Sequence, residues 1–190
     1  NVHKSPEIVE QTLMRAKPDV IGFSVLHANS CVAIQIAAVA KAIVPHVKIV
    51  FGCIGATFLW RHLLTHFKTI DYVVLGEGEY TMLSLVRCLE NNQPSAVKNI
   101  KGLAFRKQNR PFRTEPAAPI PDLDQLPQPA RYFKYQHVSF TRGCPGNCSF
   151  CGSPRFWGHT VRTHSPGFCV DQLECLYNKG VRSFYFWDDT

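Results

Sequence analysis

The chain has 190 residues, of which 45% are hydrophobic and 18% charged, the composition of a globular protein with a real core. No apolar run reaches the roughly 18 residues that a membrane-spanning helix needs, so no membrane span is expected. The formal net charge of +7 comes from scattered Lys and Arg without a nucleic-acid-binding motif, so no nucleic-acid partner is expected. Eight cysteines without a secretory signal favour a cytoplasmic location. Since residues 1–4 lack an initiating Met, we expect the chain to start partway through a longer one.

Helices and strands alternate with short loops through the first half of the chain. Ser5 and Pro6 are a suitable cap and first residue for the first helix. The alternation predicts an α/β fold, a flavodoxin-like (Rossmann-type) doubly wound parallel sheet with helices on both faces. An opening strand before Ser5 is expected to be missing. The expected helices are 5–16, 31–44, 58–67 and 80–91, and the expected buried strands are 19–26, 47–51 and 71–75.

Small residues follow three of these strands. Doubly wound sheets bind ligands outside the carboxyl ends of their strands, and small residues let the backbone approach a large ligand. Glycines that merely form turns are the alternative. Neither Gly-x-Gly-x-x-Gly nor a Walker-type lysine loop occurs, which disfavours a dinucleotide, so we expect another large cofactor at this edge. The small residues are Ser24, Gly52, Gly55, Gly76 and Gly78.

The middle of the chain predicts a domain boundary. A β-hairpin is expected over residues 99–114 with its turn at Gln108 and Asn109, and residues 115–131 are Pro-rich without periodicity. We therefore expect a first domain over 1–96, a hairpin and linker over 97–136, and a second domain over 137–190.

The sequence of the second domain predicts a strand over 137–140, a cysteine loop, a helix from Ser165 to about Asn178, and a buried strand over 181–187. Two strands cannot close a barrel, so we expect a catalytic domain that is truncated.

The cysteine loop is the strongest chemical signal in the sequence. Cys144, Cys148 and Cys151 have the spacing Cys-x-x-x-Cys-x-x-Cys. Three thiolates on a four-iron cluster leave one iron open to bind another molecule. Structural zinc is the alternative, and it needs a fourth ligand. Candidates for that ligand are His159, His164, Cys169 and Cys175, although Cys31, Cys88, Cys169 and Cys175 are more simply interpreted as buried or helix-face cysteines.

Further residues around the loop carry a family resemblance. Phe150 occupies the aromatic place of a Cys-x-x-x-Cys-x-aromatic-Cys signature. Together with residues 152–158, residues 186–190, the Gly76-Glu77-Gly78-Glu79 element and the Pro-rich linker, it resembles the cobalamin-binding subclass of radical S-adenosylmethionine enzymes. The resemblance spans nearly the whole chain and implies that residues 137–190 begin a partial (β/α) TIM barrel.

The resemblance implies a role for each matching residue. Cys144, Cys148 and Cys151 would hold three irons of a 4Fe–4S cluster whose fourth iron binds S-adenosylmethionine, and Phe150 would lie against the adenine. Asp188 and Asp189 lie where the family contacts the methionine amino group, or they form a solvated strand end. Cobalamin would lie over Ser24, Val25, Gly52, Cys53, Gly76, Glu77 and Gly78.

Two departures concern the ligand beneath cobalt. The Asp-x-His-x-x-Gly motif is absent, and His27 is better interpreted as a polar loop residue. In the turn that often reads Gly-Gly-x-His-x-Thr in this subclass, Cys53 replaces the second glycine and Gly55 takes the histidine position.

The resemblance implies a radical enzyme that acts on a small-molecule substrate with an electron donor such as flavodoxin or ferredoxin. Methyl transfer to an unactivated carbon is the leading reaction, with radical cyclisation or rearrangement as the alternative. A non-catalytic flavodoxin-like sensor with a zinc loop is a different class of answer. We expect the truncated chain to be inactive alone.

Overall fold

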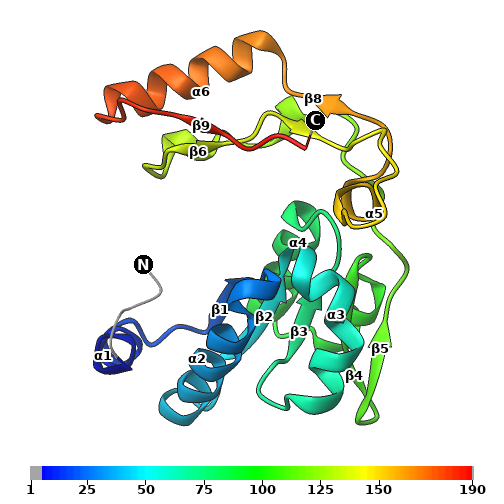
Figure 1. Cartoon of the computed structure of the whole chain (residues 1–190). Coiled ribbons are helices and arrows are strands. Elements are labelled where there is room, and N and C mark those ends of the chain that lie inside the picture. The colour runs from blue at the N-terminus through cyan, green and yellow to red at the C-terminus, as the bar shows by residue number, and fades with distance from the viewer. Residues whose placement is uncertain (1–5, 190) are drawn as a thin grey trace. The chain divides into compact units, whose positions relative to one another are not determined.

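The computed structural model describes residues 6–189, and it divides the chain into two compact units, residues 1–118 and 119–190 (Figure 1). Ser5, the expected cap of the first helix, lies outside the described residues.

The first unit is a five-stranded sheet with the strand order β1-β2-β3-β4-β5. Its helices are α1 (Pro6–Ala16), α2 (Ser30–Ile43), α3 (Cys53–His66) and α4 (Glu79–Glu90), with 3-10 turns η1 (His27–Asn29) and η2 (Pro94–Asn99). Its strands are β1 (Val20–Ser24), β2 (Lys48–Gly52), β3 (Tyr72–Val74), β4 (Leu103–Lys107) and β5 (Arg110–Arg113).

The strand pairing confirms a parallel-rich α/β sheet and adds a feature that the sequence did not predict. Strands β1, β2 and β3 are parallel, and β4 pairs antiparallel with β3. The expected hairpin exists, with Gln108 and Asn109 at positive φ in its turn. It extends the sheet, however, and so belongs to the first unit instead of to a linker that begins at residue 97.

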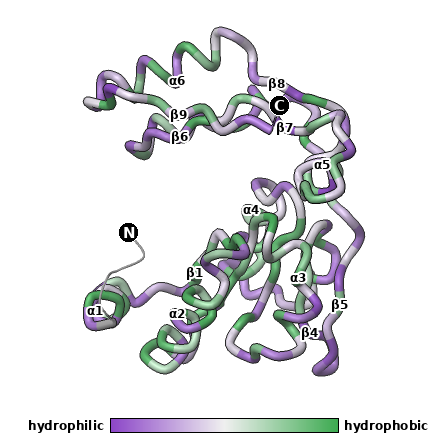
Figure 2. The backbone as a smooth tube through the Cα atoms, in the orientation of Figure 1, coloured by the Kyte–Doolittle hydropathy of each residue, from purple (hydrophilic) through white to green (hydrophobic). Residues whose placement is uncertain are grey.

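Both faces of the sheet are covered because alternate residues of each strand point to opposite sides. Ile49 and Phe51 of β2 pack with residues of α2 and α3 in one buried cluster. Val50, between them, packs in a second cluster with Leu85 of α4. In Figure 2, α2 is largely hydrophobic, whereas the tip of the β4–β5 hairpin is hydrophilic. The doubly wound arrangement of helices on both faces is therefore confirmed.

Two details of this unit differ from expectation. Strand β1 was expected to be buried, but it lies at the edge of the sheet and its residues are half-buried or exposed. Helix α3 begins at Cys53, five residues earlier than expected, directly after Gly52 in extended backbone. The short glycine-containing segment that suggested a loop is the first helical turn.

Arg106 of β4 ties the hairpin to the end of α3. Its guanidinium donates to the carbonyls of Leu64 at 3.1 Å, Phe67 at 3.4 Å, Lys68 at 3.1 Å and Ile70 at 2.5 Å. The last carbonyls of a helix have no partner within the helix, so this side chain supplies one and holds the hairpin on the sheet.

The second unit contains a β–α–β element. Its helices are α5 (Ser153–Trp157) and α6 (Pro166–Asn178), its strands are β6 (His137–Val138), β7 (Thr141–Arg142), β8 (Arg162–Thr163) and β9 (Tyr185–Phe186), and its 3-10 turns are η3 (Leu123–Gln125) and η4 (Pro129–Arg131). Strand β6 is parallel to β9, with α6 between them in the chain, and β7 pairs antiparallel with β8. The predicted start of α6 is confirmed, since the Ser165 hydroxyl accepts from the Phe168 N–H at 3.2 Å.

Most of the Pro-rich segment, from residue 119 on, is part of this unit and is not a free linker. Ile120, Leu123 and Leu126 form a small buried cluster, and Ala130 is buried against α6 with Leu176. The Lys179 ammonium, just past α6, donates to the Ala130 carbonyl at 2.6 Å. Apolar residues inside a proline-rich stretch thus fold back on the element that follows them.

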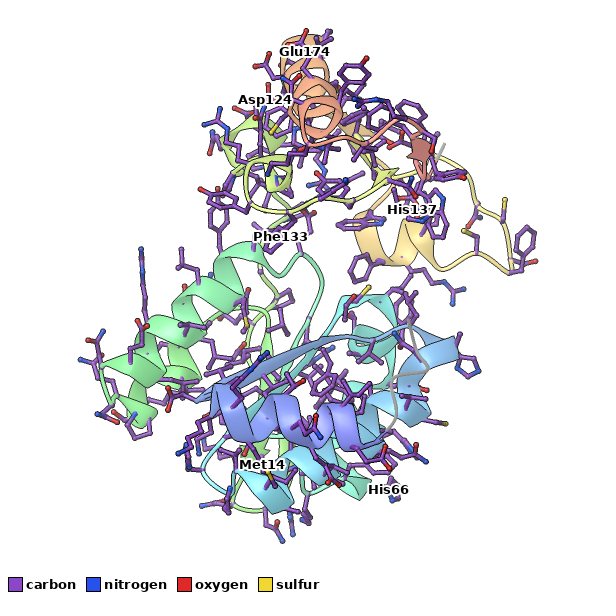
Figure 3. The ribbon with its side chains drawn as sticks, turned by 90° about the vertical axis from the view of Figure 1, so that its left-hand side faces the viewer. Met14, His66, Asp124, Phe133, His137 and Glu174 are labelled. Atoms are coloured by element: carbon purple, nitrogen blue, oxygen red, sulfur yellow. The ribbon has the colours of Figure 1, made fainter. Side chains whose placement is uncertain are left out.

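Strand β9 was expected to be buried, and this expectation is wrong. Tyr185, Phe186 and Trp187 are 52%, 60% and 68% exposed. Among the described residues, β9 pairs only with β6, so its other side has no strand to cover it. His137, labelled in Figure 3, stacks on Tyr185 and meets the Trp187 ring edge-on. No helix within residues 6–189 has both the length and the apolar character to span a bilayer.

Candidate functional site

The carboxyl ends of β1 and β2 meet at one edge of the first unit. Ser24 and Gly52, the last residues of the two strands, are register partners. The Val25 N–H then donates to the Gly52 carbonyl at 2.9 Å, and the Gly55 N–H donates to the Val25 carbonyl at 3.0 Å. The ends of the two strands and the start of α3 are therefore linked through backbone atoms.

Glycine is required at position 55 by a close backbone contact. A Cβ on Gly55 would lie 2.7 Å from the Val25 carbonyl oxygen and 3.0 Å from the Leu26 carbonyl carbon. Such distances are too short for any side chain without movement of the backbone. The neighbouring Cys53 has φ +75°, a left-handed conformation that costs a non-glycine residue free energy.

The end of β3 leaves open space beside the backbone. Gly76 has φ +69°, and a Cβ on it would meet no atom within 4 Å. Its N–H donates to the Thr57 hydroxyl of α3 at 3.0 Å. Glu77 is buried at 9% exposure, and Gly78 is the residue before α4. A ligand can approach the backbone at Gly76 without meeting a side chain of that residue.

The segments that follow β1, β2 and β3 carry exposed apolar side chains near this edge of the sheet. Leu26, Phe58 and Tyr80 are 45%, 49% and 50% exposed and lie just after β1, in the second turn of α3 and in the first turn of α4. Val25, in contrast, has its side chain in the core and offers the edge only backbone atoms. Bare backbone, open space and apolar side chains suit a broad ligand with both apolar and polar surface.

The sequence-predicted residues of the first unit thus come together in part. Ser24, Gly52, Cys53 and Gly76 are brought to linked strand ends, with Gly78 following. His27 is exposed in η1 at the same end of β1. Gly55, also among the predicted small residues, links the start of α3 to Val25, and the structure adds Thr57, which binds the Gly76 N–H.

The cysteine loop of the second unit starts at a glycine that no other residue could replace without strain. Gly143 has φ +100°, and a Cβ on it would lie 2.2 Å from the Thr160 carbonyl oxygen. The Cys144 N–H donates to the Gly158 carbonyl at 3.2 Å, and the Cys151 N–H donates to the Cys148 carbonyl at 3.2 Å. The backbone at the start of the loop is therefore fixed against residues 158–160.

The donor set of the loop suits a thiolate-bound metal centre. All eight cysteines are free, with Cys148 exposed and Cys144 and Cys151 half-buried. The Sγ atoms of Cys144 and Cys148 lie 3.4 Å and 3.9 Å from the position of a Cβ on Gly146, so that glycine leaves both sulfurs room. Within residues 6–189, no three His, Cys, Asp or Glu side chains are yet gathered as a metal site. The residue types and spacing fit a cluster, and binding requires the thiols to converge.

Of the residues considered as a fourth zinc ligand, His159 is exposed, and the other three have contacts or burial of their own. The His164 Nδ1 lies 2.9 Å from Asp124, and its ring stacks on Phe168. The Cys175 thiol donates to the Ala130 carbonyl, whereas burial raises the pKa of the Cys169 thiol and so disfavours its thiolate. Of the helix cysteines, Cys88 is buried and Cys31 is exposed.

Asp188 is bound to the strand that leads into the loop. Its Oδ1 accepts from the N–H groups of Phe140 at 2.7 Å and Thr141 at 2.8 Å, and from the hydroxyls of Thr141 at 3.0 Å and Ser139 at 3.2 Å. Burial by itself raises the pKa of Asp188, but these hydrogen bonds outweigh it and hold the pKa below its ordinary range. The carboxylate is therefore ionised at neutral pH.

Asp189 is bound to the other end of the loop. Its Oδ1 accepts a hydrogen bond from the hydroxyl of Ser153, the buried first residue of α5. Phe150, inside the loop, is 91% exposed. Ser139, Thr141 and Ser153 were not predicted as site residues, although hydroxyl residues on both sides of a loop can signal such contacts.

A family model described as "B12 binding domain" matches residues 1–86. The anaerobic magnesium-protoporphyrin IX monomethyl ester cyclase of Cereibacter sphaeroides is 31% identical over 97% of this chain and 32% of its own length. An uncharacterized methyltransferase of Pyrococcus horikoshii is 32% identical over 96% of this chain and 42% of its own length. The chain belongs to the cobalamin-binding radical S-adenosylmethionine enzyme family. It spans about a third to two fifths of these curated relatives.

Solved structures of this family share the fold. The radical S-adenosylmethionine methyltransferase TsrM from Kitasatospora setae, with tryptophan and a S-adenosylmethionine analogue bound, matches 96% of this chain and 39% of its own with a TM-score of 0.77 and 19% identity. A structure of the same enzyme with cobalamin and a [4Fe-4S] cluster bound gives a TM-score of 0.73 at 17% identity over 95% of this chain and 39% of its own.

Proposed function

We propose that this chain supplies the cobalamin-binding and cluster-binding parts of an enzyme that transfers a methyl group to an unactivated carbon of a small molecule. The observation that carries the proposal is the Cys144, Cys148 and Cys151 loop with Phe150 inside it, in one chain with a B12-binding domain. When bound, a 4Fe–4S cluster and S-adenosylmethionine supply a radical, and cobalamin supplies a methyl carrier.

The first unit would hold cobalamin at its carboxyl strand ends. Ser24, Gly52, Cys53 and Gly76 would offer backbone and small side chains to the ring, and the open space at Gly76 would admit its edge. Val25 would contribute its backbone only, since its side chain is buried, and Glu77 and Gly78 would follow at the start of α4.

The second unit would hold the cluster and S-adenosylmethionine. The three loop thiols would bind three irons, and the exposed Phe150 ring would cover the adenine, which would exclude water from one face of the site. An electron donor such as flavodoxin or ferredoxin would be needed. A cytoplasmic, reducing location suits eight free thiols.

Radical cyclisation is the second candidate, because the cyclase of Cereibacter sphaeroides is as similar to this chain as the methyltransferase of Pyrococcus horikoshii. A sensor with a zinc loop is the third. In an active enzyme that contains this sequence, identifying the carbon product as methylated or cyclised distinguishes the first two candidates. The metal content of this chain, iron or zinc, distinguishes both enzyme candidates from the zinc-loop sensor.

The test uses the 190-residue chain purified and reconstituted without oxygen. We expect about four irons per chain, set by the cluster stoichiometry, and a visible-spectrum change on addition of S-adenosylmethionine. Cys148→Ser should abolish this change, whereas Cys169→Ser, a matched change on α6, should not. Stoichiometric zinc without iron uptake would refute the proposal.

The cobalamin part has an independent test on the same chain. Ser24 is exposed at the end of β1, so Ser24→Phe should leave the fold intact and weaken hydroxocobalamin binding, measured from its visible spectrum, by about tenfold. Ser95→Phe, at an exposed position in η2, is the control. Equal binding by both variants would place the corrinoid elsewhere.

A further inference from the structure

The cysteine loop leaves the second unit's core at one point and returns at another. It follows β7 (Thr141–Arg142) and ends where α5 (Ser153–Trp157) begins. Both points meet the same dipeptide, Asp188–Asp189, which comes just after β9 (Tyr185–Phe186). One acidic pair therefore touches the chain on both sides of the three thiols.

The contact at the entry continues the pairing of two strands. The Trp187 N–H donates to the Val138 carbonyl at 2.8 Å, the last backbone bond between these segments. One residue further on, Asp188 accepts from the N–H groups of Phe140 and Thr141 at 2.7 Å and 2.8 Å. A carboxylate oxygen with two backbone donors makes strong, charge-assisted hydrogen bonds. The backbone three residues before Cys144 is therefore fixed by a side chain.

The contact at the exit is a side-chain pair. The Ser153 hydroxyl donates to Asp189 Oδ1, and Ser153 is 8% exposed, so little water competes for the bond. Ser153 is two residues after Cys151. The loop between the two contacts carries the exposed Cys148 and Phe150.

We propose that Asp188 and Asp189 are positioning residues that hold the two ends of the cysteine loop, so that its three thiols can converge on one metal centre. This differs from the role that the sequence implied for the pair, because Asp188 Oδ1 already serves four donors of its own chain. The metal-binding part of this inference rests on the proposed function, whereas the bracing of the loop does not.

The bracing is tested in the metal-free, reduced chain by thiol alkylation and amide exchange. Asp188→Ala should speed alkylation of Cys144 and exchange of the Phe140 and Thr141 amides by about tenfold and leave Cys151 little changed. Ser153→Ala should speed Cys151 and leave Cys144 little changed. Loss of the fold would speed both cysteines together, so this end-specific pattern distinguishes positioning from unfolding.

Conservative and control variants complete the test. Asp188→Asn keeps an acceptor oxygen and should restore most of the protection of Cys144. Asp171→Asn, at an exposed position on α6, removes the same charge and should behave as the unchanged chain. If Asp188→Ala unfolds the unit, seen as lost exchange protection in α6, the Asp188→Asn and Ser153→Ala results still decide the matter.

Iron uptake tests whether the bracing of the loop supports metal binding. The chain with both Asp188→Ala and Asp189→Ala should take up less than half of about four irons. Unchanged uptake, or equal alkylation rates of Cys144 and Cys151 in all variants, would overturn the inference. If the unchanged chain takes up no iron while the end-specific alkylation pattern persists, the bracing stands and the proposed function fails.

Discussion

Gly55→Ala tests the close contact that joins β1 to α3. The new Cβ would lie 2.7 Å from the Val25 carbonyl oxygen, and few real Cβ contacts are shorter than 3.4 Å, so the backbone must move by about 0.7 Å. Overpacking of this kind costs about 1–3 kcal/mol, and the bond from the Gly55 N–H to Val25 contributes about 1 kcal/mol more. Alanine's better helix propensity returns about 1 kcal/mol.

The expected net loss is therefore about 2 kcal/mol in the unfolding free energy of the first unit. Amide hydrogen exchange in β2 measures it as roughly 30-fold faster exchange of the slowest amides. Gly22→Ala in β1 is the control, because its Cβ would meet only the Met82 Cε atom at 4.0 Å. A Gly55→Ala chain within about 0.5 kcal/mol of the original would refute the contact.

Three further changes follow from single features of the structure. Cys53→Gly should stabilise the first unit by about 0.5–1 kcal/mol in denaturant unfolding, because Cys53 has φ +75°, which glycine adopts without strain. The control is Cys31→Gly in the ordinary helical backbone of α2, which should destabilise the unit by a similar amount. Arg106→Met should cost about 2–3 kcal/mol in the same assay by leaving helix-end carbonyls unpaired, with exposed Arg110→Met as a near-neutral control. Since hydrogen bonds hold the pKa of Asp188 below its ordinary 3.8, its stabilisation is fully present above that pH and is lost as the pH falls through the lower folded-state pKa.

The pH dependence is measured as the exchange protection of the Phe140 amide relative to an unstructured peptide. The difference in this protection between the original chain and Asp188→Ala should be constant above about pH 5 and should become smaller below it. A difference that grows on acidification would contradict the sign of the shift. For Arg106→Met, a loss no larger than that of Arg110→Met would show that the capping bonds contribute little.

The parts of the fold that sequence predicted are those with strong local signals. Apolar runs such as Val47–Phe51 predicted the buried strand β2, and the Ser165–Pro166 pair predicted the start of α6, where the structure shows the cap. The Gln108–Asn109 turn predicted the hairpin because both residue types suit a tight turn. Local chemistry alone decides these features.

The parts that were missed depend on distant partners. Strands β7 and β8 have two residues each, too few for any periodicity, and they exist because residues 141 and 163 pair across the cysteine loop. The hairpin's place in the sheet depends on β3, and the burial of β1 and β9 depends on how many neighbours each has. In the candidate site, the spacing of the cysteines predicted the metal-binding thiols. The contact between Ser153 and Asp189 is visible only in the folded structure.

Arg106 has a practical consequence for recombinant work on the first unit. A polypeptide ended at residue 96 would lack the hairpin and leave β3 as an open sheet edge. It would also lack Arg106, the donor to the Leu64 carbonyl and to the carbonyls just after α3. Open, apolar strand edges promote self-association, so such a product should aggregate. Ending the polypeptide near residue 118 keeps β4 and β5 and with them a paired β3, which makes that position the better place for a stop codon.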